Sequence, residues 1–208
     1  MRGAGARGNP SAACSTIPAV TPATRWPETR AARGLVATPH ALASAAGVAA
    51  LRRGGNALDA AVAAATTIAV VYPHMNSIGG DNVWLLIPSM YLVDGRPRLV
   101  YGTMGGDGQP QTQAALVIRA VDCGLGPYAA VEAPRWLFGR TWGEVSRSLR
   151  LESRFAPDVG TGLRRRGHEV EVVEDWSDLM GHAQVIRLDP DGLAGGSDPR
   201  ADGAALGW

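Results

Sequence analysis

The sequence predicts an α+β fold in which a mainly antiparallel sheet is flanked by helices. Two helical runs stand early in the chain, at residues 39–51 and 57–71, and short β-type runs follow, most of them separated by turn residues. Strands joined by short turns pair antiparallel, and helices before and between them cover the faces of the sheet. At 208 residues the chain is long enough to bury a core of its own.

Residues 1–33 differ in composition from the rest of the chain. They are rich in Gly, Ala, Pro, Thr and Arg, and they lack an apolar run long enough for the core of a signal peptide. We expect them to form a disordered leader of a cytoplasmic protein. No apolar run in the sequence reaches membrane-spanning length.

The first structured segment begins at Gly34. Residues 34–37 read as a short strand, and Thr38 followed by Pro39 predicts a helix N-cap with proline at the first helical position. Arginines and glycines at residues 52–55 predict the end of that helix, because cations and glycine favour a helix C-terminus.

A second helix follows at residues 57–71. Asn56 and Asp59 have the spacing of a capping box at its start. The helix is apolar on nearly every face, through residues such as Val62, Ile68 and Val70. We therefore expect it to be buried and closely packed.

The remaining elements follow from turn and breaker residues. Asp94-Gly95 is a strong hairpin signal between two β-type runs. In chain order we expect strands at 83–87, 90–93 and 98–102, helices at 111–121 and 128–133, a strand at 149–152, a helix at 158–166, strands at 169–173, 183–188 and 193–196, and a Gly/Ala-rich tail at 198–208.

A glycine turn, residues 105–108, stands where the strand at 98–102 leads into the helix at 111–121. Gly105 and Gly106 have no Cβ, so they can take positive φ and leave their N–H groups free for an anion, which the first turn of a helix also favours. Such a turn suits the oxyanion hole of an acyl-transfer enzyme. An ordinary loop accounts for the same residues, so the rest of the chain must decide.

Charge and composition exclude several kinds of function. The 20 basic residues are all arginine and face 19 acidic ones, which gives a net charge of +1 and no indication of a nucleic-acid or membrane partner. Without lysine, a P-loop, a Schiff-base lysine and a Ser–Lys catalytic pair are excluded. The histidines show no i, i+4 pairing and the two cysteines lie far apart, so we expect no metal site and no cofactor.

Several longer motifs follow one another in a fixed order. They occupy residues 34–40, 51–63, 72–80, 94–97, 102–107, 130–136, 166–168 and 196–200. Together they resemble the γ-glutamyltransferase (γ-glutamyltranspeptidase) family: residues 34–86 resemble the start of its large subunit, and residues 87–208 resemble the C-terminal part of its small subunit.

The resemblance implies an N-terminal-nucleophile hydrolase, here with an incomplete αββα sandwich. In this family a precursor cuts itself, and the threonine exposed at the new N-terminus is the nucleophile that takes the γ-glutamyl group of glutathione-like amides. Its α-amine is the base that the hydroxyl needs. The family pattern also implies that Gly105 and Gly106 are the oxyanion-hole glycines.

The sequence departs from the family at the junction of Leu86 and Ile87. The family's middle is absent there, including the nucleophile and the residues that bind the substrate's α-carboxylate and α-amine, so no substrate-binding residue can be named. Thr103 is a possible replacement nucleophile beside the glycine turn, but it lacks the surroundings of the family's threonine. We therefore expect an inactive family member.

Three hypotheses stay open at this point. The chain is an active γ-glutamyl hydrolase or transferase, or a non-catalytic remnant, or a pseudogene product. As a remnant it would associate with itself or with a full-length relative, through its apolar second helix and unmatched strand edges.

Overall fold

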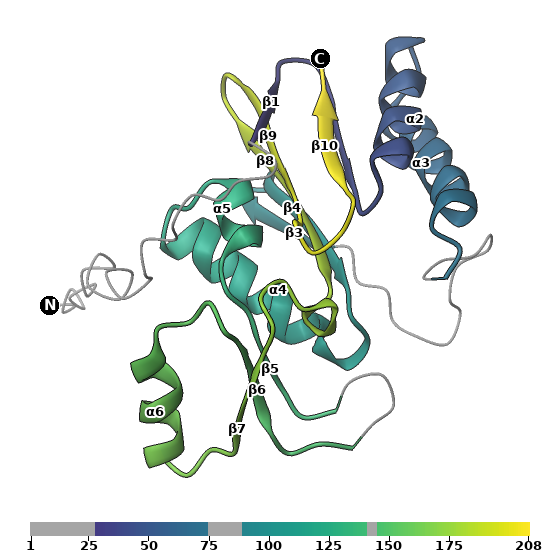
Figure 1. Ribbon diagram of the computed structural model, residues 1–208. Helices are drawn as coiled ribbons and strands as arrows, with labels where there is room; N and C mark the ends of the chain where they lie inside the picture. Colours follow the sequence, from purple (N-terminus) through teal and green to yellow (C-terminus); the bar gives the residue numbers. More distant parts are fainter. Residues whose placement is uncertain (1–27, 75–88, 141–144) are drawn as a thin grey trace, which may run out of the picture.

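The computed structural model describes residues 28–74, 89–140 and 145–208 (Figure 1). The strand predicted at 83–87 and the junction of Leu86 and Ile87 lie outside the described residues. The elements form four layers: a pair of helices, a two-stranded sheet, a five-stranded sheet and a second group of helices. The predicted α+β class, an αββα sandwich with a mainly antiparallel sheet, is confirmed.

The five-stranded sheet is antiparallel throughout. Its order is β1 (Thr29–Ala31), β9 (Gly192–Ser197), β8 (His182–Asp189), β4 (Arg96–Met104) and β3 (Ser89–Val93). The predicted turn between β3 and β4 is present, with φ of 51° at Asp94 and 73° at Gly95. These positive φ values give the backbone twist that a two-residue hairpin needs.

Strand β1 corrects the predicted leader. Residues 28–33 were expected to belong to a disordered segment, but Thr29–Ala31 pair with residues 193–195 of β9. The Thr29 hydroxyl also donates a hydrogen bond of 2.7 Å to the carbonyl oxygen of Ala205. Local composition could not reveal these partners, because they come from residues far along the chain.

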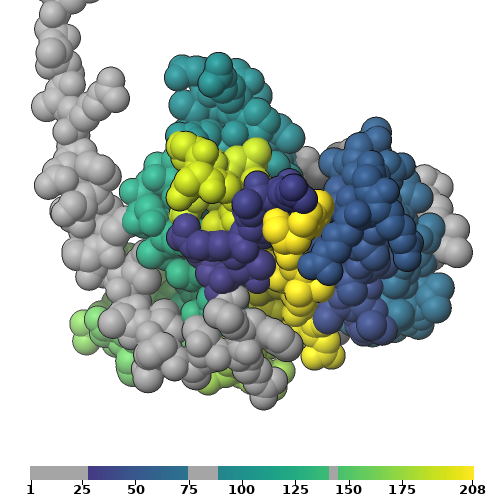
Figure 2. Space-filling view, turned by 90° about the horizontal axis from the view of Figure 1, so that it is seen from above, coloured from purple at the N-terminus to yellow at the C-terminus, as the bar shows by residue number. Residues whose placement is uncertain are grey.

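The two-stranded sheet joins β2 (Leu35–Thr38) to β10 (Ala204–Gly207), again antiparallel. Strand β2 was predicted, whereas β10 falls in the stretch expected to be a tail. The strand forms because β2 offers it an open edge. Seen from above in Figure 2, yellow β10 lies between purple residues of the N-terminal strand β1 and the blue helices α2 and α3.

Helix α2 (Ala41–Arg52) packs on this small sheet. Its N-cap is His40, whose Nδ1 accepts from the N–H of Leu42. The predicted N-cap, Thr38, is instead the last residue of β2, and its hydroxyl donates to the carbonyl oxygen of His40 at 2.8 Å. That prediction was wrong because Thr38 is held in the sheet by its pairing with Ala204.

Helix α3 (Ala57–Val71) begins with the predicted capping box of Asn56 and Asp59. The expectation that the whole helix is buried was wrong. It buries only the side that holds Ala60, Ala64 and Ile68, and it packs mainly on α2. The opposite side is open to solvent, with Leu58 76%, Val62 64% and Val70 71% exposed.

The other face of the five-stranded sheet is covered by α4 (Gln109–Val117), a π-helical turn (Ile118–Asp122) and α5 (Pro127–Glu132). The core between these helices and the sheet consists of Leu99, Leu116, Ala130, Val131, Ala183 and Val185.

Beyond these helices lies a small sheet of β5 (Trp136–Phe138), β6 (Leu149–Glu152) and β7 (Val170–Val173), with α6 (Pro157–Arg165) beside it. Strands β6 and β7 are parallel, unlike the others. Among the described residues, no helix has the length and apolar character needed to cross a membrane.

Candidate functional site

The glycine turn lies at the C-terminal end of β4. Gly105 has φ of 140° and Gly106 has φ of 52°, so both take the backbone conformation that favours glycine. Residues Gly106–Gly108 form a 3₁₀ turn that leads directly into α4. No hydrogen bond among the described residues uses the amide hydrogen of Gly105 or Gly106. The predicted positive φ is confirmed, and the role as an oxyanion hole stays a prediction.

A second glycine supports this turn from behind. Gly181 follows a 3₁₀ turn (Asp178–Met180) and precedes β8. A Cβ on Gly105 would lie 3.1 Å from the Cα of Gly181, and a Cβ on Gly181 would collide with the carbonyl oxygen of Met104. The two backbones therefore pass too close for side chains, and the position of residues 178–182 sets the position of the turn.

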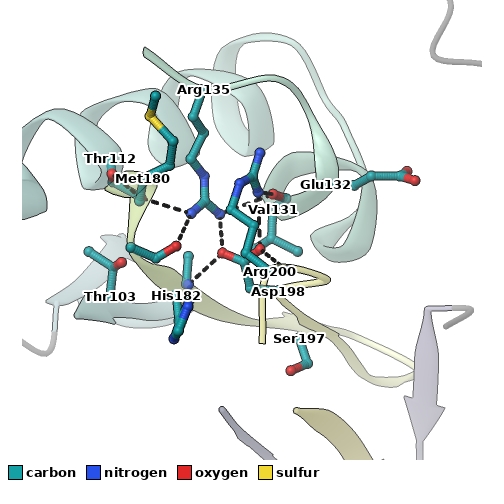
Figure 3. Close-up of polar contacts among 12 residues, drawn as sticks. Thr103, Thr112, Val131, Glu132, Arg135, Met180, His182, Ser197, Asp198 and Arg200 are labelled. Carbon is teal, nitrogen blue, oxygen red and sulfur yellow. Dashed lines mark hydrogen bonds and ion pairs between the residues drawn. The ribbon is translucent and has the colours of Figure 1, made fainter. Parts of the chain in front are cut away.

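Arg135, Asp198 and Arg200 belong to a buried network of charges that reaches the carbonyl oxygen of Met180 (Figure 3). Arg135 Nη2 lies 2.5 Å from Asp198 Oδ2, with both side chains almost fully buried. Arg200 pairs with both oxygens of Glu152 at 2.6 Å and with Asp198 Oδ1 at 3.0 Å. Such buried pairs require well-placed hydrogen bonds to offset the loss of water.

Backbone groups supply those hydrogen bonds. Arg135 Nη1 donates to the carbonyl oxygens of Met180 at 3.2 Å and Gly181 at 2.9 Å. Asp198 accepts from the N–H of Ala183 at 2.7 Å and from that of Arg200 at 3.0 Å. The network thus ties the turn after β9 and the loop after α5 to the segment that supports Gly105.

Both partners of the central pair carry charge at neutral pH. Burial and the like charge of Arg200 lower the pKa of Arg135 to about 9, against the attraction of Asp198. Burial opposes ionisation of Asp198, but the charges of Arg135 and Arg200 and two backbone hydrogen bonds outweigh it and lower the pKa of its carboxyl.

The lowered pKa of Asp198 predicts an acid dependence of stability. An aspartate in an unfolded chain has a pKa of about 3.9, so as pH falls below about 4 the unfolded chain binds a proton before folded Asp198 does. The free energy of unfolding should hold from neutral pH down to about pH 5 and then decrease.

Urea denaturation across this range would measure the effect. The Asp198→Asn variant should lack this part of the acid dependence. The Asp107→Asn variant, which removes the exposed pair with Arg140, should keep it. Equal acid slopes in wild type and Asp198→Asn would contradict the assignment.

The replacement nucleophile considered from the sequence gains no support from this geometry. The hydroxyl of Thr103 donates to the carbonyl oxygen of Met104 at 2.7 Å. Thr103 stands opposite Ala183 in the β4–β8 register, and the side chain of Ala183 lies in the core. Since directly opposed residues point to the same face of a sheet, Thr103 faces α4 and α5.

A cluster that the sequence did not predict surrounds Tyr72. Its hydroxyl lies 3.3 Å from Nδ1 of His182, and its ring lies 4.3 Å from that of His74 and 6.3 Å from that of His40. Three of the four histidines in the chain therefore gather at one place. Local patterns could not reveal the cluster, because His40 and His182 are far from Tyr72 in the sequence.

The same cluster adjoins the glycine turn. His182 stands opposite Met104 in the β4–β8 register, one residue before Gly105. Burial, followed by the charges of Asp178 and Asp202, raises the pKa of Tyr72, so its hydroxyl stays protonated at neutral pH. Within the described ranges no three His, Cys, Asp or Glu side chains lie close enough together to hold a metal ion.

The four layers, with a glycine turn at the end of an inner strand, form the fold of the N-terminal-nucleophile hydrolases. The model of the gamma-glutamyltranspeptidase family matches residues 43–87 and 85–208. The chain therefore belongs to the gamma-glutamyltranspeptidase family.

Several known proteins are similar to this chain over part of their length. A glutathione hydrolase-like YwrD proenzyme from Bacillus subtilis is 50% identical over 123 residues, which are 59% of this chain and 23% of that protein. An oxamate amidohydrolase proenzyme from Klebsiella pneumoniae is 55% identical over 118 residues, or 56% of this chain and 22% of that protein.

A solved structure shows the same partial likeness. The cephalosporin acylase from Bacillus halodurans is 36% identical with a TM-score of 0.52, over 58% of this chain and 22% of that one. The matched residues thus span less than a quarter of these proteins.

Proposed function

We propose that this chain is a gamma-glutamyltranspeptidase-family protein that binds small amides or carboxylates at the Gly105–Gly106 turn but does not cleave them. The observation that carries the proposal is the turn itself, which offers two amide hydrogens that no hydrogen bond among the described residues uses, beside a buried supporting network. Two adjacent N–H donors at a helix start suit a carbonyl oxygen that gains negative charge.

The lack of catalysis follows from what an oxyanion hole can do. Its donors stabilise a tetrahedral intermediate, which forms only when a nucleophile with an adjacent base attacks the carbonyl. In the described residues two threonine hydroxyls on the elements that flank the turn are engaged with the backbone: that of Thr103 with Met104, and that of Thr112 with Met180.

The two family matches support the same proposal. They meet at residues 85–87, while the relatives have most of their length outside the matched part. This pattern agrees with the loss of a central segment that carries the family's threonine nucleophile.

The relatives suggest which ligands to try. One is named a glutathione hydrolase-like proenzyme and the other an oxamate amidohydrolase proenzyme, so the site would accept a γ-glutamyl amide or a smaller amide with a neighbouring carboxylate.

We expect the purified chain to release neither chromophore from a γ-glutamyl anilide nor ammonia from oxamate above the buffer rate. The full-length Bacillus and Klebsiella relatives would serve as positive controls. Turnover that disappears in Thr103→Ala would overturn the non-catalytic part of the proposal.

Binding is measured separately. With ¹⁵N-labelled protein, the amide signals of Gly105 and Gly106 should shift in a saturable way as oxamate is added. The signals of Gly95 and Gly167, which lie in distant turns, should stay in place. If the signals of Gly105 and Gly106 do not move, the turn does not bind such a ligand and the proposal fails.

A second role, association with a full-length relative, draws on the exposed apolar side of α3. Leu58 is followed by Val62 four residues on and by Val70 eight residues after that, spacings that keep them on one side of the helix.

A further inference from the structure

The Tyr72 cluster connects the two parts of the chain that match the family separately. Tyr72 is the C-cap residue of α3 and lies in the first matched part, whereas His182 begins β8 in the second. The Tyr72 hydroxyl lies 3.3 Å from His182 Nδ1, and His182 Nε2 lies 3.3 Å from Asp178 Oδ1. His182 is only 4% exposed, so this series of hydrogen bonds passes through a buried imidazole, from the partly buried Tyr72 to Asp178 at the surface.

The chemistry of Tyr72, His182 and Asp178 determines which group donates each of the two hydrogen bonds. A carboxylate oxygen of Asp178 is an acceptor, so its contact with Nε2 of His182 favours the tautomer that carries the proton on Nε2. Nδ1 of a neutral imidazole is then an acceptor, and Tyr72 donates its hydroxyl proton to it. The raised pKa of Tyr72 is consistent with a tyrosine that keeps this proton.

The segment held by the hydrogen bonds from Tyr72 to Asp178 also supports the glycine turn. Residues 178–182 include Gly181, against which Gly105 packs, and His182 stands opposite Met104. Arg135 holds the same segment from the core through the carbonyl oxygens of Met180 and Gly181. The segment is therefore fixed from two sides, by Arg135 and by Tyr72 through His182.

We propose that Tyr72 is a positioning residue for the Gly105–Gly106 turn and acts through His182. The first matched part of the chain thereby sets the geometry of a site whose donors all come from the second. The identity of the ligand at that site rests on the proposed function, whereas the claim that Tyr72 positions the turn does not. His40, His74 and Asp202 also face Tyr72 and would tune the strength of its hydrogen bond.

The hydrogen bond from the N–H of Gly108 to the carbonyl oxygen of Gly105 reports on the turn without any ligand. In Tyr72→Phe, hydrogen exchange at Gly108 should accelerate about five- to tenfold, the effect of losing one partly buried hydrogen bond. The ¹⁵N signals of the His182 imidazole should also lose the fixed pattern of a bare Nδ1 and a protonated Nε2.

Tyr101→Phe is the matched control. It makes the same chemical change on β4, the strand that carries the turn, but its ring packs on the opposite core cluster. Exchange at Gly108 should stay within about twofold of wild type in this variant. The amide of Leu149, bonded to Glu169 in the small sheet, is an internal reference that should not change in either protein.

Each outcome decides the proposal. Unchanged exchange at Gly108 and an unchanged His182 pattern in Tyr72→Phe would overturn it. Equal acceleration at Gly108 and Leu149 would also overturn it, because that result marks a general loss of stability.

Oxamate titrations distinguish the positioning role of Tyr72 from the proposed function of the turn as a ligand site. If Tyr72→Phe weakens oxamate binding and Tyr101→Phe does not, positioning extends to the ligand. If wild type itself shows no oxamate-dependent shift, the proposed function fails, while exchange at Gly108 still decides the role of Tyr72.

Discussion

Replacing Arg135 with methionine is expected to lower the free energy of unfolding by about 3–5 kcal/mol, the usual effect of leaving a buried charge without its partner. Asp198 is fully buried and would lose the ion pair with Arg135, keeping the one with Arg200. The carbonyl oxygen of Gly181 would lose the donor that Arg135 provides, while that of Met180 would keep the hydroxyl of Thr112. Urea denaturation at neutral pH, followed by circular dichroism, would measure the change.

Arg140→Met is the matched control for this prediction. It breaks an ion pair with Asp107 at 3.1 Å, but the two side chains are 52% and 38% exposed. Water and salt weaken such a pair, so its loss should change stability by about 1 kcal/mol or less. If the two variants lost similar stability, the buried network would not be the support that its geometry indicates.

Gly181→Ala is expected to destabilise the protein by about 3 kcal/mol or more, through strain at positive φ combined with overpacking. Gly181 has φ of 71°, and an added Cβ would collide with the carbonyl oxygen of Met104. Relief would require β4 and β8 to separate where the glycine turn begins. Thermal unfolding would detect the loss, and the amide signals of Gly105 and Gly106 would show whether the turn is displaced.

Gly167→Ala separates the two causes. Gly167 has φ of 91°, but no atom lies within 4 Å of the position a Cβ would take. Only the backbone strain remains, which costs about 1–2 kcal/mol. A result in which Gly167→Ala is as harmful as Gly181→Ala would mean that close contact between the two strands contributes little.

Features with local causes could be predicted from the sequence. The capping box of Asn56 and Asp59 involves two residues three apart, and the hairpin at Asp94-Gly95 depends on the φ preferences of its own turn. The positive φ of Gly105 and Gly106 belongs to the same group, because a glycine pair between a strand and a helix permits it.

Features that depend on distant partners could not be predicted. Helix α3 is apolar on most sides, and the sequence could not tell that α2 would cover only one of them. Residues 204–207 have the composition of a tail, and they form a strand because they pair with the distant strand β2. At the site, Arg135 and Asp198 lie within family-like motifs, but nothing in the sequence says that they face one another in the interior.

The pairing of β2 with β10 affects the order in which the chain can fold. Helices α2 and α3 leave the ribosome early, but the hydroxyl of Ser44 in α2 donates to the carbonyl oxygen of Ala204, 160 residues later. Contacts between such distant residues form slowly, because a long loop must close first. During synthesis the apolar surfaces of the two helices therefore stay exposed until β10, on which α2 packs, has been made. A chaperone would be needed most in this interval.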